Sequence, residues 1–313
     1  MQLKALTVGN TQVKNNIFLA PMAGYTDYSI RKLQLSLGIG LAFTELVSAK
    51  GLMYGSKKSN QILLYSKGDE KDTAAQIFGA DPYYLRAACE SEYLAPFNIV
   101  DINMGCPVPK VFKNGEGSAL LTDINKAENI IKECVKSGKN ITVKIRTGQK
   151  KGDDIATDFA KMAENAGASL ITIHGRVRED YYSGEPDFNA IEKAKKAVKI
   201  PVIANGGIFT KEDAENMLDK TGADGLMLAR GAIANPFLIC ELLGAEYDLT
   251  LKEYIKKHVS LMTEIYADRR AALEFRKFTP YYFKGMTGVK DLKLALVQAE
   301  STAQIIDLID KGL

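Results

Sequence analysis

The chain has 313 residues, of which 46% are hydrophobic and 25% are charged, and its formal net charge is +3. This length allows one large domain and a small one, and so small a net charge does not by itself indicate a nucleic-acid partner. No apolar run approaches the roughly 20 residues of a membrane helix, and the first residues lack the apolar core of a signal peptide. The four cysteines are widely spaced, which argues against a zinc site and for a reducing compartment. We therefore expect a soluble, cytoplasmic protein without a metal.

Short β-type runs alternate with longer helical patterns over the first three quarters of the chain. The candidate strands are Ile17–Pro21, Ala42–Glu45, Ala74–Phe78, Ile99–Asn103, Thr142–Arg146, Leu170–His174, Pro201–Ala204 and Gly225–Leu228. The amphipathic segments between them include Ala127–Ser137, Asp154–Ala166, Phe188–Val198 and Lys211–Lys220. Gly222 stands near the end of the last segment, and Thr210 followed by Asp213 indicates a capping box at its start. Eight strands, each followed by a crossover, favour an α/β fold of the (β/α)8 TIM-barrel type over a doubly wound sheet.

The alternation of strand and helix patterns ends at about Gly244. Beyond it we predict only helices, at Leu251–Ala267, Ala271–Phe278 and Leu292–Ile309. We therefore predict two domains, a barrel in residues 1–244 and a small α-helical domain in residues 245–313, called the tail below. From residue 256 to residue 293 the tail has nine Lys or Arg and four Asp or Glu, an excess of five positive charges. A charge run of this kind is usually a solvated helical face.

Cys106 stands in the segment Asn103-Met104-Gly105-Cys106-Pro107, directly after an apolar strand pattern. A thiol on the first loop after a barrel strand lies on the face where barrels carry their functional residues. The alternative is a structural cysteine, because free cysteines are often buried and inert, and no base stands beside Cys106 in the sequence. The residues at the other strand ends decide between these two interpretations.

The ends of the last two strands predict an anion site. Asn205-Gly206-Gly207 follows the seventh strand, and Ala229-Arg230-Gly231 follows the eighth. In barrels these two loops, with the helix N-terminus that follows, often bind phosphate through backbone N–H groups, and an arginine adds a charged donor. A Gly-Gly pair alone would indicate only a tight turn. With Arg230 on the next strand, we favour phosphate binding.

Lys144 lies within an apolar strand and should point into the barrel. A buried lysine is unfavourable unless it meets an anion. A salt bridge with an interior carboxylate such as Glu45 or Asp101 is the alternative to a ligand. Both interpretations place the ammonium group on the axis side of the strand.

The remaining strand ends favour a planar cofactor beside the anion. Pro21-Met22-Ala23-Gly24 forms a backbone corner that fits a flat ring, Gln76 can donate and accept hydrogen bonds, and His174 ends the sixth strand. Together with Lys144, which would stabilise the negative charge of a reduced ring, this set fits flavin mononucleotide (FMN).

These motifs resemble the bacterial tRNA-dihydrouridine synthase family, in its B-type form. The matching segments are Ala20-Pro21-Met22-Ala23-Gly24, Gln76-Ile77-Phe78-Gly79, Asn103-Met104-Gly105-Cys106-Pro107, Lys144-Ile145-Arg146, His174-Gly175-Arg176, Asn205-Gly206-Gly207-Ile208 and Ala229-Arg230-Gly231-Ala232, and in the tail Arg276-Lys277 and Tyr281-Tyr282-Phe283-Lys284-Gly285. They span the barrel in the family's order. The chain departs from the family pattern at Phe278, where a histidine is common, and at Ala229, where a glycine is common.

The resemblance implies reduction of the C5=C6 bond of specific tRNA uridines to dihydrouridine, with NADPH reducing bound FMN. It implies that FMN is bound by Pro21, Met22, Ala23, Gln76, Lys144, His174, Asn205, Gly206, Gly207, Ala229 and Arg230. It also implies that Asn103 holds the uracil and that Cys106 is the catalytic acid. Hydride transfer from flavin N5 to uracil C6 leaves negative charge at C5 and O4. A thiol with a pKa near roughly 8.5 is mostly protonated at pH 7, so it can donate the proton to C5.

The target base must leave its stack to reach a flavin inside the barrel, so the protein needs contacts with the RNA backbone. We predict substrate contacts by the cations Arg146, Arg176, Arg178, Arg276, Lys277 and Lys284. Tyr181 and Tyr182, in the loop after the sixth strand, are candidates for base stacking, with loop packing as the alternative. We expect a monomer whose partner is tRNA, with no membrane or metal.

Other functions remain open at this point. A dihydroorotate dehydrogenase-like FMN barrel would act on a free pyrimidine and would not need a basic tail. In a non-redox phosphate-binding barrel Cys106 would be incidental, and an RNA-binding protein without catalysis would not need Cys106, Lys144 and His174. The same reaction on ribosomal RNA, the position of the uridine, and the choice between NADPH and NADH are also left open by the sequence.

Overall fold

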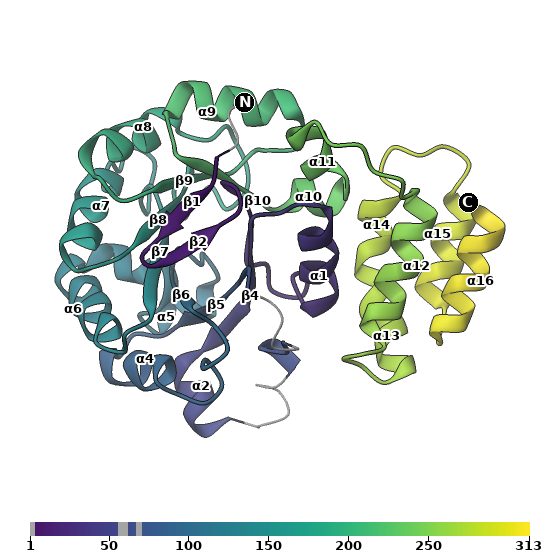
Figure 1. Ribbon diagram of the computed structural model, residues 1–313, viewed down its shortest axis with the longest axis horizontal. Coiled ribbons are helices and arrows are strands. Elements are labelled where there is room, and N and C mark those ends of the chain that lie inside the picture. The colour runs from purple at the N-terminus through teal and green to yellow at the C-terminus, as the bar shows by residue number, and fades with distance from the viewer. Residues whose placement is uncertain (1–3, 56–61, 67–70) are drawn as a thin grey trace.

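Eight parallel strands close into a barrel in the order β10-β3-β4-β5-β6-β7-β8-β9 (Figure 1). The computed structural model describes residues 4–55, 62–66 and 71–313. The barrel strands are β3 (Ile17–Leu19), β4 (Leu41–Ser48), β5 (Thr73–Phe78), β6 (Ile99–Met104), β7 (Asn140–Arg146), β8 (Leu170–His174), β9 (Val202–Asn205) and β10 (Gly225–Leu228). The predicted TIM barrel is confirmed, and every predicted strand overlaps one of these eight.

Helices cover the outside of the barrel, as Figure 1 shows. They are α1 (Tyr28–Leu37), α2 (Ala49–Tyr54), α4 (Pro82–Cys89), α5 (Pro109–Lys113), the 3-10 helix η1 (Gly117–Thr122), α6 (Ile124–Val135), α7 (Ala156–Asn165), α8 (Phe188–Ala197), α9 (Lys211–Thr221), α10 (Arg230–Ala234) and α11 (Leu238–Leu243). The predicted capping box is present, because Thr210 and Asp213 exchange side-chain to backbone hydrogen bonds at the start of α9. Gly222 ends that helix at φ 61°, a left-handed conformation that favours glycine.

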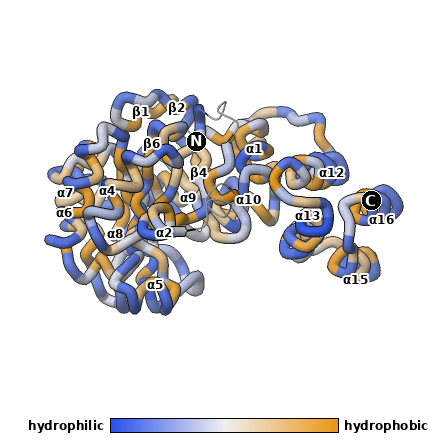
Figure 2. Tube along the Cα trace, turned by 90° about the horizontal axis from the view of Figure 1, so that it is seen from below, coloured by the Kyte–Doolittle hydropathy of each residue, from blue (hydrophilic) through white to orange (hydrophobic). Residues whose placement is uncertain are grey.

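A short antiparallel hairpin precedes the barrel and was not predicted. It consists of β1 (Leu6–Val8) and β2 (Thr11–Val13), and two strands of three residues are too short to show a periodicity. Its buried side chains pack with apolar residues inside the barrel, among them Phe18 and Phe43. Figure 2 shows the hairpin and α5 at opposite ends of the barrel. The hairpin therefore closes the end away from the loops that follow the strands.

The interior of the barrel changes from apolar to polar along the strands. At the hairpin end, the rings of Phe18 and Phe43 lie 6.2 Å apart and both are fully buried. The polar residues buried further along are Thr44, Gln76, Asp101, Thr142 and Thr172. At the carboxyl ends, strand register pairs Asn103 with Lys144, and His174 with Asn205. The fold thus brings residues from four neighbouring strands to the same end of the barrel.

The tail consists of helices only. They are α12 (Leu251–Met262), α13 (Asp268–Phe275), the 3-10 helix η2 (Arg276–Phe278), α14 (Thr279–Tyr282), α15 (Lys290–Gln298) and α16 (Thr302–Gly312). The single helix predicted for residues 292–309 is wrong, because Ser301 starts a new helix by accepting a hydrogen bond from the Gln304 N–H. Residues 245–250 form neither helix nor strand. This break supports the domain boundary that we propose at residue 244.

Aromatic residues join the tail to the barrel. The ring of Tyr25, in the loop between β3 and α1, makes edge-on contacts with Phe278 at 5.5 Å and with Tyr281 at 5.4 Å. Phe278 is fully buried, so the phenylalanine that departs from the family pattern serves packing. Beside it, burial lowers the pKa of His258 to about 4, and its Nδ1 lies 2.8 Å from the Tyr282 hydroxyl. The junction is therefore built mainly of aromatic rings around a neutral histidine.

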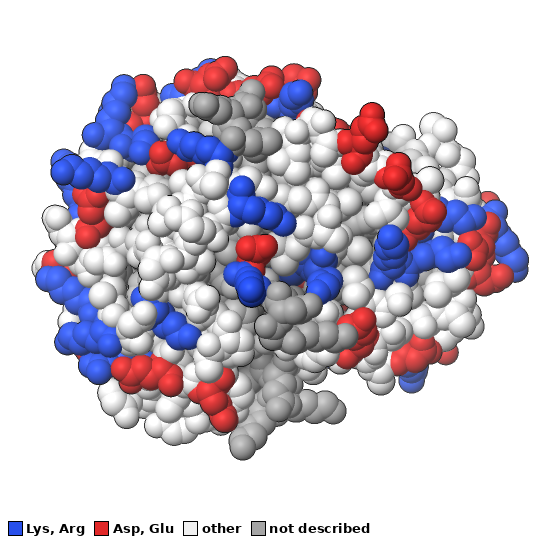
Figure 3. Space-filling view, viewed as in Figure 1, with Lys and Arg blue, Asp and Glu red and all other residues white. Residues whose placement is uncertain are grey.

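The described residues show neither a membrane-spanning helix nor a surface of one charge on the hairpin face. None of their helices has the length and hydropathy of a membrane-spanning segment. On the face that carries β1 and β2, Figure 3 shows basic and acidic side chains interspersed. An excess of positive charge is found instead at the opposite end of the barrel, where the loops follow the strands.

The apolar end of the barrel should carry much of the stability. We expect Phe18→Ala to lower the free energy of unfolding by about 3–5 kcal/mol, because it removes a fully buried ring and leaves a cavity. The measurement is urea unfolding followed by circular dichroism. As a control, Tyr83→Ala, at a side chain that is 71% exposed, should shift stability by less than about 0.5 kcal/mol. Equal effects of the two substitutions would contradict this picture of the core.

Candidate active site

A cavity of about 610 Å³ opens at the carboxyl ends of the barrel strands. The predicted residues in its wall are Pro21, Met22, Ala23, Asn103, Cys106, Lys144, Arg146, His174, Arg176, Asn205, Gly206, Gly207, Ala229 and Arg230. Gln76 is the one predicted cofactor-binding residue outside the wall, since it is fully buried in the barrel interior. The residues singled out at strand ends thus come together in one place.

The wall of the cavity carries positive charge. Lys144, Arg146, Arg176 and Arg230 line it, and no Asp or Glu of the described residues does. Burial lowers the pKa of Arg146 to about 10 and that of Lys144 to about 8, so both groups are mostly charged at neutral pH. A concave site with one sign of charge favours a ligand of the opposite sign.

The loop after β9 forms a glycine cradle. Gly206 and Gly207 have φ values of 118° and 71°, which favour glycine. A Cβ at Gly206 would lie 2.8 Å from His174 Cδ2, and one at Gly207 would lie 2.9 Å from Pro186 Cγ. Any larger residue would therefore fill this part of the cavity. The cradle, with Arg176 and Arg230 beside it, suits the close backbone contacts that a phosphate needs.

Lys144 reaches across the barrel rather than forming the salt bridge considered above. Its Nζ donates a hydrogen bond to Asn205 Oδ1 at 3.0 Å. Asp101 instead accepts hydrogen bonds from neutral neighbours, and Glu45 accepts one from the Gly24 N–H. The lysine is thus left to interact with a ligand in the cavity.

His174 is a neutral ring in this charged surrounding. Burial, together with the charges of Lys144, Arg146, Arg176 and other cations, lowers the pKa of His174 well below its ordinary value. Its Nε2 lies 3.2 Å from Arg176 Nη1, so Nε2 accepts a hydrogen bond and the proton lies on Nδ1. The histidine therefore offers an N–H donor rather than a charge.

A chain of buried amides links the barrel interior to the thiol. Gln76 Nε2 donates to Asp101 at 2.7 Å, and Gln76 Oε1 accepts from Asn103 Nδ2 at 2.9 Å. Asn103 Oδ1 accepts in turn from the backbone N–H groups of Cys106, at 2.9 Å, and of Gly105, at 3.2 Å. Gln76 thus orients Asn103, and Asn103 orients the turn that carries the thiol.

The thiol loop (residues 105–117) is held in place by the barrel. Arg146 Nε donates to the Gly105 carbonyl at 2.9 Å, and the Ser118 N–H donates to the Cys106 carbonyl at 3.1 Å. Burial raises the pKa of the Cys106 thiol, although Arg146 and Lys144 act in the opposite direction. The half-buried thiol is therefore protonated at neutral pH.

Comparison with known proteins agrees with this site. The family model described as dihydrouridine synthase (Dus) matches residues 18–310. The chain is 34% identical over 310 residues to tRNA-dihydrouridine synthase B of Pseudomonas putida, with 96% of this chain and 92% of that protein covered. It is 36% identical over 289 residues to tRNA-dihydrouridine synthase B of Vibrio parahaemolyticus, with 89% of each covered. The chain belongs to the dihydrouridine synthase family. The resemblance drawn from the sequence motifs is therefore confirmed.

Solved structures of similar shape show the fold alone. One is histamine dehydrogenase from Rhizobium sp. 4-9, with a TM-score of 0.61 and 14% identity over 82% of this chain and 50% of that one. Another is 6-hydroxypseudooxynicotine amine oxidase from Pseudomonas geniculata, with a TM-score of 0.60 and 12% identity over 91% of this chain and 55% of that one. The chain spans about half the length of these two proteins.

The predicted RNA-contacting cations outside the cavity differ in how exposed they are and in what they contact. The Arg178 guanidinium lies 3.9 Å from the centre of the Phe112 ring, in the thiol loop. Arg276 is half-buried, and its Nη2 donates to the Ala299 carbonyl at 2.9 Å. Lys277 pairs with Glu274 at 2.6 Å. Lys284 is exposed, so it is the most accessible cation of this dihydrouridine synthase's predicted tail contacts.

Several aromatic residues of the cavity were missed or only partly predicted from the sequence. Tyr25, Phe209 and Tyr281 line it, and Tyr281 comes from the tail. Each directly follows or lies within a family motif, which is the signal that could have identified them. Tyr182, a predicted stacking residue, also lines the cavity, with the Arg230 guanidinium 4.8 Å from its ring centre. Tyr181 is 43% exposed and does not line it.

The protonation state of Cys106 can be tested by alkylation. Only the thiolate reacts with iodoacetamide, and the pKa of Cys106 is raised. We expect slow modification at pH 7, with a rate that still increases with pH beyond about 8.5. Peptide mapping by mass spectrometry separates Cys106 from the three buried cysteines, and Cys106→Ser identifies its peptide. A rate that levels off below pH 8 would show a thiolate and contradict the assignment.

Proposed function

We propose that this protein is an FMN-dependent tRNA-dihydrouridine synthase that uses NADPH to reduce specific uridines in tRNA. Membership of the dihydrouridine synthase family supports the reaction, and the names of the B-type relatives support tRNA as the substrate. The observation that carries the proposal is the cavity itself, where a glycine cradle, Lys144 and a protonated thiol face one space.

The positive charge of the cavity and its glycine cradle support FMN as the cofactor. Gly206, Gly207 and Arg230 would hold the phosphate, and Lys144 and His174 would contact the flat ring, whose reduced form is anionic. Residues 21–23 offer a backbone edge along the opposite wall. When bound and reduced, FMN supplies the hydride that adds to C6 of the uracil. Gln76 would contribute indirectly, by orienting the Asn103 side chain.

Asn103 and Cys106 would act on the uracil. Asn103 lines the cavity at the end of β6, directly before the thiol loop, and its amide would contact the base. Hydride addition at C6 leaves negative charge at C5, and the Cys106 Sγ–H donates the proton that neutralises it. Burial raises the pKa of the thiol, so the proton is present before the reaction begins. Lys144 and Arg146 would stabilise the thiolate that remains.

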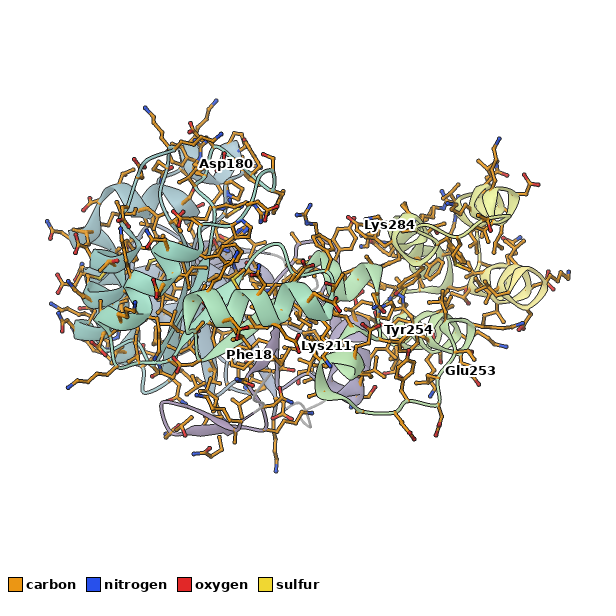
Figure 4. The ribbon with its side chains drawn as sticks, turned by 90° about the horizontal axis from the view of Figure 1, so that it is seen from above. Phe18, Asp180, Lys211, Glu253, Tyr254 and Lys284 are labelled. Carbon is orange, nitrogen blue, oxygen red and sulfur yellow. The ribbon has the colours of Figure 1, made fainter. Side chains whose placement is uncertain are left out.

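The tail would hold the RNA while one base enters the barrel. Figure 4 shows Asp180, in the loop after β8, and Lys284, in the tail, on the same side of the molecule. An RNA held across this side would meet Lys284 with its backbone. We retain Lys277 as a weaker contact because Glu274 neutralises it, whereas the hydrogen bond of Arg276 to Ala299 makes that side chain mainly structural. Family membership favours RNA over the free pyrimidine considered from the sequence.

Removal of the thiol tests the reaction. We expect purified Cys106→Ala to retain FMN but to form dihydrouridine in an unmodified tRNA transcript about 10²–10⁴-fold more slowly, because the proton donor is lost. The measurement is single-turnover formation of dihydrouridine with NADPH, detected by mass spectrometry of nucleosides. Wild-type protein is tested on tRNA and on ribosomal RNA. If it reduces only ribosomal RNA, the tRNA assignment is wrong, and if Cys106→Ala is as fast as wild type, the acid is another group.

Lys144 should make flavin binding depend on pH. Its pKa in this structure is about 8, so the ammonium attracts an anionic ligand below pH 8 and loses its proton as pH rises through that value. We expect the affinity for FMN to fall between pH 8 and 9.5 in the wild type. Lys144→Met should bind FMN about tenfold or more weakly at pH 7, corresponding to roughly 1.4 kcal/mol, and should lose this pH dependence.

Fluorescence titration of apoprotein with FMN provides the measurement. Lys139→Met serves as the matched control, since Lys139 is also a partly buried lysine with a lowered pKa but donates to the Leu94 and Phe97 carbonyls away from the cavity. An unchanged pH dependence in Lys144→Met would assign the titration to another group.

A further inference from the structure

Phe209 is an exposed aromatic side chain at the mouth of the cavity. It lines the cavity, yet 37% of its surface remains exposed. It lies two residues after Gly207 in the chain and lines the same cavity as the proposed flavin site. Nothing in the reduction chemistry described above uses this ring.

The backbone that carries Phe209 is rigid. The N–H groups of Phe209 and Thr210 both donate to Asp213 Oδ2, at 2.8 and 3.0 Å, in the capping box of α9. The preceding residue is also confined, because a Cβ at Gly231 would lie 2.1 Å from the Ile208 carbonyl oxygen. The backbone from which the ring projects is therefore already ordered in the absence of a ligand.

Two cations from different parts of the chain lie near the ring of Phe209. The Arg230 guanidinium, from the barrel, lies over the ring at 5.6 Å from its centre, and Lys284 Nζ, from the tail, lies over it at 5.8 Å. An exposed ring next to accessible cations is the arrangement that proteins use for single-stranded nucleic acid, in which bases stack on rings and phosphates meet the cations. Arg230 belongs to the anion site of the cavity, whereas Lys284 is exposed.

We propose that Phe209 is the stacking platform for the base of a nucleotide next to the target uridine, and that Lys284 binds the phosphate of that nucleotide. This inference rests on the proposed function, since it needs an RNA whose uridine is flipped into the cavity. A flipped base leaves its neighbour with one uncovered face. Phe209 covers that face at the entrance and so stabilises the opened strand.

The ring and the cation predict different signatures in RNA binding. Stacking on a ring releases no counterions, whereas each phosphate contact contributes roughly 0.7–0.9 to the slope of log affinity against log salt concentration. We expect Phe209→Ala to weaken binding of an unmodified tRNA transcript by the FMN-loaded protein roughly 5- to 150-fold with an unchanged salt slope. Lys284→Ala should reduce the slope by roughly 0.7–0.9.

A conservative variant and a remote control separate stacking from misfolding. Phe209→Trp should bind as tightly as the wild type, because it keeps a flat ring. Tyr83→Ala removes a ring that is 71% exposed on α4, outside the cavity wall, and should bind tRNA like the wild type. A general loss of affinity on removing any exposed ring would overturn the assignment to Phe209.

A direct readout uses 2-aminopurine in place of the base beside the reduced uridine, once the wild-type enzyme has been used to map that uridine. We expect its fluorescence to be lower in complex with the wild type and with Phe209→Trp than with Phe209→Ala. If the wild type reduces uridine but Phe209→Ala matches it in affinity for tRNA and in 2-aminopurine fluorescence, the assignment of Phe209 as the stacking platform is wrong. The proposed function would still hold. If the wild type reduces no uridine in RNA, the proposed function itself fails.

Discussion

The arrangement of the site depends on a group of cations that meet no carboxylate in the described wall of the cavity. Burying such charges is unfavourable, so their hydrogen bonds must be made elsewhere. Arg146 donates to the Gly105 and Val177 carbonyls, and Arg176 donates to the Ser183 and Gly184 carbonyls. These arginines therefore order the loops around the cavity while they give it positive charge. A substitution at either position would change both properties together.

The same cations act on two neighbouring groups with different results. Burial lowers the pKa of His174, and the cations lower it further, so the ring stays neutral. For Cys106 they oppose burial, and burial has the larger effect, so the thiol stays protonated. The absence of a base beside Cys106, which weakened the catalytic interpretation of the sequence, is what an acid requires. Because the thiol loop is already held by Asn103 and Arg146, the thiol that we propose as the proton donor is in place before RNA binds.

The barrel and the residues at its strand ends could be predicted because both depend on local patterns. Apolar runs mark strands buried on both faces, and polar or glycine residues directly after them lie at one end of a parallel barrel. Contacts between distant segments could not be predicted in this way. The charges of Arg178 and Arg276 were visible in the sequence, but their neighbours, the Phe112 ring and the Ala299 carbonyl, are set by tertiary packing. The hairpin and the break before Ser301 were missed because such short elements show no periodicity.

The tail contributes to the site as well as to the surface around it. Tyr281 lines the cavity and also packs edge-on against Tyr25, so one residue belongs both to the cavity wall and to the junction between barrel and tail. Phe278 contacts the same Tyr25 ring from the buried side of the junction. The position of the tail is therefore fixed by the contacts that shape the mouth of the cavity. A change in this aromatic core would therefore also change the wall of the cavity at Tyr281.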